Sequence, residues 1–222
     1  MGFLSRYRRP EDLPRKIPLF PLAGALLLPR AELPLNIFEP RYLAMVDDAM
    51  SGSRVIGMIQ PAAGQEAADV PGLMKVGCAG RITSYAEQAD GRLLITLSGI
   101  CRFELVEELE AITPYRQAIA SYHPFAADLV SAAGAAAVNR PALLKAFRDF
   151  LEANQMSADW DQVGSAPTEV LVNMLSQLAP YPPKEKQALL EAPDLKTRAD
   201  VLVALTEVAL SRMVKSGKPR LQ

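Results

Sequence analysis

Few residues of this chain combine the side chain types and the spacing that catalysis requires. The 222 residues include a single histidine, His123, and two cysteines, Cys78 and Cys101. Any serine or cysteine nucleophile activated by an imidazole would have to use His123 as its base. His123 stands directly before Pro124, a position typical of a structural or linker residue. No G-x-S-x-G sequence is present to expose a hydrolase serine on a sharp turn. The sequence predicts no catalytic residue.

The two cysteines favour packing over chemistry. Cys78 and Cys101 lie on segments with strand-like alternation, where cysteine behaves as a small hydrophobic residue. Two cysteines without a C-x-x-C spacing are too few for a disulfide framework and indicate a reducing compartment. A zinc site would need both cysteines, His123 and a carboxylate to converge, and no spacing suggests that they do. We therefore expect two core cysteines and no metal.

The sequence lacks the phosphate-binding motif that nucleotide-hydrolysing enzymes usually carry. A phosphate-binding loop of the G-x-x-x-x-G-K-[ST] type is missing. Gly52 and Gly57 have its first spacing, but Met58 and Ile59 follow in an apolar run. No cofactor is predicted, and an enzyme of unknown type is the least favoured functional hypothesis because no cluster of titratable residues marks a site.

Charge and composition are those of an ordinary globular protein. Lys and Arg total 24 against 25 Asp and Glu, and 50% of the residues are hydrophobic. Proteins built to hold nucleic acid or anionic membrane need a clustered positive excess, which the net charge of -1 argues against. The most apolar stretch, residues 21–29, is far shorter than the roughly 20 residues of a membrane span. No export signal is evident.

The elements that would position functional residues change character near residue 122. Before it, short apolar runs alternate with Pro and Gly, a pattern typical of strands. One helix interrupts this half, beginning at Pro40 and ending at Ser51-Gly52, and Ala62–Pro71 is expected to be a mobile surface loop. Asp90-Gly91 predicts a tight hairpin turn. Strands are expected at residues 54–60, 75–87, 92–97, 101–106 and 115–122.

Beyond Pro124 the hydrophobic period becomes helical. Asp194 is placed to cap the last of the expected helices. The alanine-rich segment 126–138 favours either a helix or a connector, because Gly134 interrupts it. Four helices can close a small bundle. They are expected around residues 143–152, from Pro167, over 183–191 and from Leu195.

An ordered series of short motifs is the most specific feature of the sequence. It comprises IPLFPL at residues 17–22, LLP at 27–29, LPL at 33–35 and IFEPRY at 37–42. Later segments continue it at residues 56–60, 76–82, 99–103, 166–169, 171–173 and 184–191. The series resembles the N-terminal, substrate-binding domain of the Lon ATP-dependent protease. The resemblance covers about Ile17 to Leu210.

The resemblance implies an α+β fold, in which an N-terminal PUA-like, mostly antiparallel β pseudo-barrel is followed by a C-terminal helical bundle. Together with the change in periodicity, it divides the chain into a basic N-terminal arm (1–16), a barrel subdomain (17–122) and an α-helical bundle subdomain (123–222). It implies a bacterial, cytoplasmic protein. Because no ATPase or peptidase module follows, we expect a stand-alone Lon-domain protein without enzymatic activity.

The function that the resemblance implies is polypeptide binding. Unfolded or damaged polypeptides are the expected partners, with an adaptor or regulator role in protein quality control beside a Lon-type protease. Glu39, Arg41 and Tyr42 are the candidate peptide-binding residues, since Arg41 offers planar donors and Tyr42 an amphipathic ring. Alternatively, the three residues hold a helix to the barrel, with Glu39 at the helix start. An exposed strand edge and a groove between barrel and bundle are further candidate sites.

Two other functions remain as alternatives. PUA-like barrels include RNA-binding domains, and the N-terminal arm is rich in arginine, although a short charged terminus is usually solvated. Deletion of residues 1–16 at high salt would separate tail-mediated contact from true RNA binding. A self-associating scaffold is the other alternative, because Val201, Val203 and Val208 give the last helix a second apolar face.

Overall fold

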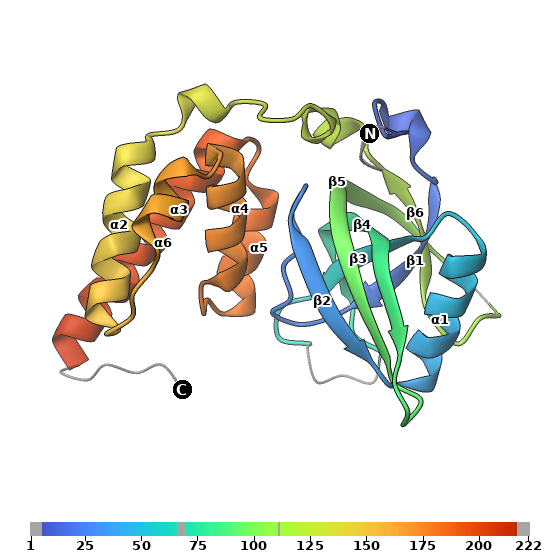
Figure 1. Ribbon diagram of the computed structural model, residues 1–222. Helices are drawn as coiled ribbons and strands as arrows, with labels where there is room; N and C mark the ends of the chain where they lie inside the picture. Colours follow the sequence, from blue (N-terminus) through green and yellow to red (C-terminus); the bar gives the residue numbers. More distant parts are fainter. Residues whose placement is uncertain (1–5, 66–69, 111, 217–222) are drawn as a thin grey trace. The chain divides into compact units, whose positions relative to one another are not determined.

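The computed structural model describes residues 6–65, 70–110 and 112–216 of the chain (Figure 1). Two compact units are formed by the chain. One contains the residues up to Ser131 together with Pro180–Leu190, and the other contains Ala132–Ala179 and the residues from Glu191 onward. All six strands of the described chain lie in the first unit together with two helices, and the second unit is helical, so the predicted α+β fold is confirmed. The predicted subdomain boundaries at residues 16/17 and 122/123 stay predictions.

Six strands of the described chain form one sheet that closes on itself. In order along the sheet they are β2, β5, β4, β3, β1 and β6, and β5 also pairs with β6. All pairs are antiparallel except β1 with β3. The strands are β1 (Lys16–Pro21), β2 (Glu32–Ile37), β3 (Val55–Pro61), β4 (Leu73–Glu87), β5 (Leu93–Leu109) and β6 (Gln117–Ser121). Among the described strands, β2 pairs with β5 alone, and Pro34 of β2 lacks the N–H that pairing with a second strand would use.

Local sequence signals explain several of these elements. β3 is buried at every position, as its continuous apolar run predicts. Gly91 turns the β4–β5 hairpin with a φ of 80°, and Asp90 Oδ1 accepts a hydrogen bond from the Arg92 N–H. Helix α1 (Pro40–Ser51) begins at its proline and buries Tyr42, Met45, Val46 and Ala49. The predicted loop 62–71 lies partly outside the described residues.

The barrel core contains both cysteines. Cys78 on β4 and Cys101 on β5 have no exposed surface, which confirms their predicted packing role. Burial raises the pKa of the Cys101 thiol, and the nearby Asp128 carboxylate raises it further. Thiolate, the reactive form of cysteine, is therefore scarce at this position at neutral pH.

We expect both thiols to resist labelling in the folded protein. Ellman's reagent should modify them at less than about one hundredth of the rate seen in urea, because a reagent reaches a buried thiol only after unfolding. Counting thiols by absorbance before and after denaturation checks this. Rapid reaction of one thiol in native buffer would contradict the buried placement of that cysteine.

The N-terminal segment from Tyr7 onward packs on the barrel, in contrast to the solvated arm that its charge predicts. Tyr7 and Leu13 are buried in the barrel cluster. The Tyr7 hydroxyl accepts a hydrogen bond from Arg81 Nη1 (3.1 Å), and the Tyr122 hydroxyl donates to the Pro14 carbonyl (2.9 Å). Two apolar side chains anchor this segment, an effect that net charge does not reveal.

The helical unit has one short helix that the sequence pattern does not predict. α3 spans only six residues, too few for an apolar period to emerge, and Asp159 caps it by accepting from two backbone N–H groups. Asp194 caps α6 as predicted, accepting from the Thr197 N–H at 2.7 Å. Segment 126–138 includes the end of the 3₁₀ turn His123–Leu129 and the whole of the 3₁₀ turn Ala135–Ala137. The helices of this unit are α2 (Arg140–Ala153), α3 (Trp160–Ser165), α4 (Thr168–Leu178) and α6 (Leu195–Ser216).

Helix α5 has the predicted bounds, Pro183–Glu191, but it packs with the strands. Gln187 Nε2 donates to the Val76 carbonyl of β4 (3.1 Å), and Arg102 Nη1 of β5 donates to the Leu190 carbonyl (3.0 Å). Periodicity identifies the buried face of a helix but not the surface that covers it. This is why the sequence groups α5 with the other helices.

Candidate functional site

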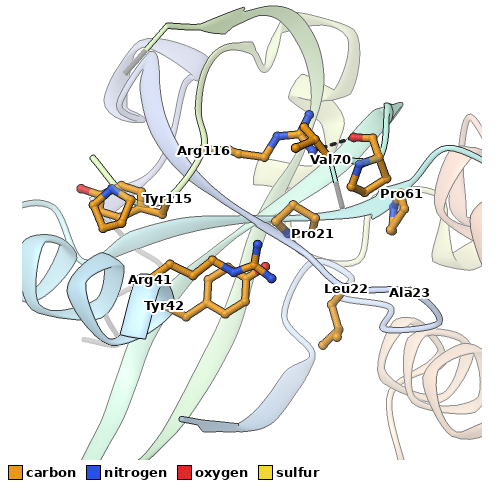
Figure 2. Close-up of a pocket in the computed structure, with 11 residues that line it drawn as sticks. Pro21, Leu22, Ala23, Arg41, Tyr42, Pro61, Val70, Tyr115 and Arg116 are labelled. Atoms are coloured by element: carbon orange, nitrogen blue, oxygen red, sulfur yellow. Dashed lines mark hydrogen bonds between the residues drawn. The ribbon is translucent and has the colours of Figure 1, made fainter. Parts of the chain in front are cut away.

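A cavity of about 430 Å³ opens on the barrel at the point where β1 and β6 separate (Figure 2). The last pair of these strands is Pro18 with Gln117, and β1 then continues to Pro21 beside β3 alone. The Leu19 N–H still donates to the Arg116 carbonyl (2.8 Å), after which the two segments diverge. The cavity occupies the gap, between the end of β1, the start of α1 and the segment that leads into β6.

Two of the three candidate peptide-binding residues line this cavity. Arg41 and Tyr42 contribute to its wall from the first turn of α1. Glu39 holds Arg41 in place, because its Oε2 accepts from Arg41 Nε (2.9 Å) and lies 2.7 Å from Nη2. The Arg41 guanidinium carbon lies 4.6 Å from the centre of the Tyr42 ring. Glu39 is thus a neighbour of the cavity and orients one of its cations.

Tyr42 also has a packing role. Its ring is buried, and the ring centre lies 4.3 Å from that of Phe20 on β1. Burial raises the pKa of the Tyr42 phenol, so the hydroxyl is protonated at neutral pH. These contacts fit the interpretation that the motif fastens α1 to the barrel. The same residues present the Arg41 cation and one aromatic edge to the cavity, and their role in binding stays a prediction.

A second arginine, Arg116, lies across the cavity and was missed by sequence reasoning. Its Nε and Nη2 donate to the two carboxylate oxygens of Glu108 (2.5 and 2.6 Å), and Nη1 donates to the Pro71 carbonyl (2.7 Å). Arg116 belongs to none of the short motifs, and it meets Arg41 only through the closure of the barrel. Figure 2 shows the two side chains entering the cavity from different elements.

Tyr115 closes another part of the wall. Its hydroxyl donates to Asp48 Oδ2 of α1 at 2.5 Å. Burial and this hydrogen bond raise the pKa of Tyr115 to about 12. The phenol therefore remains a donor across the physiological range and ties the segment before β6 to α1.

Much of the cavity wall is apolar. Pro21, Pro61, Pro71 and Pro114 provide apolar rings without N–H groups, and the exposed Val70 adds a further apolar side chain. The two arginines, Arg41 and Arg116, are each paired with a carboxylate, so their positive charges are largely balanced.

The residues with catalytic potential lie elsewhere. His123 is exposed, with Nε2 3.7 Å from Glu11 Oε1, and the cysteines are buried. Within the described ranges no three His, Cys, Asp or Glu side chains are grouped as a metal site would require. Among those same residues, no helix has the length and hydropathy to cross a bilayer.

The fold and the cavity define the class of protein: a closed, mostly antiparallel β-barrel with a cavity where β1 and β6 separate, followed in the chain by a helical unit. The chain belongs to the family described as the ATP-dependent protease La (LON) substrate-binding domain, whose model matches residues 16–207. The resemblance drawn from the short motifs is thereby confirmed.

Relatives and solved structures agree with this assignment. Lon protease 2 of Myxococcus xanthus is 24% identical over 205 residues, which cover 88% of this chain and 24% of that protein. Lon protease of Desulfosudis oleivorans is 30% identical over 110 residues, or 49% of this chain and 13% of the relative. The chain thus spans about a quarter or less of these relatives, and the family match covers only their substrate-binding domain.

Two solved structures have the same fold. The Lon N-terminal domain protein from Xanthomonas campestris aligns with a TM-score of 0.59 at 24% identity, covering 85% of this chain and 97% of that one. The N-terminal domain of the Mycobacterium avium complex Lon protease aligns with a TM-score of 0.63 at 16% identity, covering 86% and 98%.

Proposed function

We propose that this protein is a polypeptide-binding module that holds unfolded or damaged segments of other proteins in the cavity beside Arg41 and Tyr42. One observation carries the proposal: a domain of the LON substrate-binding family has a cavity of about 430 Å³ where strands β1 and β6 of its barrel separate. That volume lies within the usual range of ligand sites. The protein acts without catalysis of its own, as a cytoplasmic adaptor or regulator that presents clients to a Lon-type protease.

The proposed binding mode follows from the cavity wall. Apolar side chains of an extended segment pack against the proline rings and Tyr42, where they lose contact with water. The Arg41 Nη1 group donates no hydrogen bond within the part of the chain that the structure describes, and the side chain is 49% exposed. It is therefore available to a backbone carbonyl of the bound segment. Glu39 keeps the guanidinium aimed at the cavity.

Replacement of Arg41 by glutamine tests the site. We expect Arg41→Gln to weaken binding about fivefold to tenfold, because it removes a charged donor and the flat face beside Tyr42. The probe is a fluorescein-labelled 20-residue peptide with Leu, Val and Phe in a neutral Gly/Ser background. Fluorescence anisotropy gives the dissociation constant.

Arg92→Gln is the matched control for this substitution. Arg92 Nε lies 2.7 Å from Asp90 Oδ2, with the same two-residue spacing and a similar exposure to the Arg41–Glu39 pair, but Arg92 does not line the cavity. The control should bind the peptide as tightly as the native protein. Equal weakening in the two variants, or no saturable binding by the native protein, would refute the proposed site.

A further inference from the structure

Gln60 is a buried polar residue at the end of β3, next to Pro61 of the cavity wall. Its side chain is 2% exposed and makes three hydrogen bonds. Oε1 accepts from the Gly24 N–H (3.1 Å), and Nε2 donates to the Pro183 carbonyl (3.2 Å) and to Gln187 Oε1 (3.0 Å). One amide group therefore joins the β1–β2 loop to α5.

The amide can occupy this site in only one orientation. An inverted amide would place its NH₂ against the Gly24 N–H and its oxygen against the Pro183 carbonyl, so that donors face donors and acceptors face acceptors. Gln187, 4% exposed, extends the network by donating from Nε2 to the Val76 carbonyl of β4. A buried network of this kind is costly to break, because each group that loses its partner has no water to replace it.

The loop held by Gln60 is part of the cavity wall. Leu22 and Ala23 line the cavity, and Gly24 follows them with a φ of 73°. The Leu22 N–H donates to the Ile59 carbonyl (3.0 Å), so β3 fixes the loop at two points. A Cβ on Gly24 would lie 4.0 Å from Pro183 Cγ, which places the loop directly beside the start of α5.

We propose that Gln60 is a positioning residue that couples occupation of the cavity to the docking of α5 on the barrel. This inference rests on the proposed function. A segment that presses on Leu22 and Ala23 displaces Gly24, and Gln60 either follows it or loses its hydrogen bond. In the first case the bonds to Pro183 and Gln187 weaken, and in the second Gln60 is left with an unpaired oxygen. The packing of α5 on the barrel therefore changes when the cavity is occupied, through the hydrogen bonds of Gln60 and Gln187.

The coupling is tested first without any ligand. Gln187→Leu removes the acceptor of Gln60 Nε2 at the far end of the network. We expect the Gly24 amide to exchange with solvent about tenfold faster in this variant, as measured by NMR, because its acceptor is no longer held in place. Gln88→Leu, an exposed position of the β4–β5 turn, is the control and should leave the rate unchanged. An unchanged Gly24 rate in Gln187→Leu overturns the proposal.

The second measurement uses the labelled 20-residue peptide at saturation. We expect amide exchange over residues 183–191 to change at least threefold on peptide binding in the native protein, and not in Gln60→Leu at a peptide concentration that anisotropy shows to saturate that variant. Gln60→Met replaces it if the leucine variant does not fold by circular dichroism. An α5 response that persists in the Gln60 variant, or its absence in a native protein that binds peptide, overturns the coupling. Failure of the native protein to bind peptide refutes the proposed function, and the Gly24 measurement then decides on the coupling alone.

Discussion

Asp128→Asn should lower the free energy of unfolding of the barrel unit by about 3–5 kcal/mol, the usual cost of removing one partner of a buried ion pair. Arg102 on β5 is 2% exposed and Asp128 is 9% exposed. Arg102 Nε and Nη2 donate to the two carboxylate oxygens at 2.8 and 2.9 Å, and the Arg102 N–H donates to Oδ2 at 3.0 Å. The substitution removes the carboxylate charge that faces the buried guanidinium.

The Arg102 side chain joins three parts of the barrel unit. Nη1 donates to the Leu190 carbonyl of α5, and the guanidinium carbon lies 4.4 Å from the centre of the Phe125 ring. Arg30 Nη1 also donates to the Asp128 carbonyl, at 2.7 Å. Loss of the carboxylate is therefore expected to loosen α5 and the 3₁₀ turn as well as β5.

Urea unfolding followed by far-ultraviolet circular dichroism measures the effect. Asp90→Asn, which breaks an exposed ion pair of the same unit, is the control and should cost less than about 1 kcal/mol. The double variant Arg102→Met/Asp128→Leu should recover most of the loss, since apolar residues of similar volume remove both buried charges together. A loss below about 1 kcal/mol in Asp128→Asn would contradict a role for the pair in holding these elements together.

Elements with local signals were predictable from the sequence. Asp90-Gly91 indicates its turn because the backbone angles are a property of those two residues. Pro40 and Asp194 indicate helix starts for a similar reason, since the proline ring fixes the φ of a first helical residue and the aspartate accepts from a nearby N–H group. Arg41 and Tyr42, which line the cavity, could be proposed as candidates because they belong to a motif that is continuous in the sequence.

What the sequence could not provide depends on contacts between distant residues. Arg116 reaches the cavity only because β6 pairs with β1, and no feature of its neighbours marks it. Gln60 and Gln187 form hydrogen bonds that join α5 to the barrel, and their polar side chains carry no periodic signal in the sequence. The pairing of Arg102 with Asp128 spans 26 residues and appears in sequence as two ordinary surface charges.

Gly99→Ala is the other substitution expected to have a large effect, a loss of about 3 kcal/mol or more in the free energy of unfolding. A Cβ at this position of β5 would lie 2.0 Å from the Leu28 carbonyl oxygen and 2.8 Å from its carbon. Both atoms belong to the backbone, so no rotation of a side chain can relieve the overlap. Either β5 or the segment that contains Leu28 must move.

That segment is held on β5 by hydrogen bonds on both sides of the contact. The Arg30 N–H donates to the Gly99 carbonyl (2.8 Å), and the Gly99 N–H donates to the Ala31 carbonyl (2.9 Å). Leu28 itself is fully buried. Movement away from an added methyl group would stretch both bonds and withdraw a leucine from the core, so that overpacking and lost burial add together.

Gly91→Ala provides the control because it separates backbone conformation from crowding. Gly91 has a φ of 80°, which costs alanine about 1–2 kcal/mol, but a Cβ there meets no atom within 4 Å. Urea unfolding of both variants should therefore place Gly99→Ala well below Gly91→Ala in stability. If the two variants lose the same free energy of unfolding, the segment around Leu28 shifts at little energetic cost. The close approach of that segment to β5 then contributes little to the stability of the barrel.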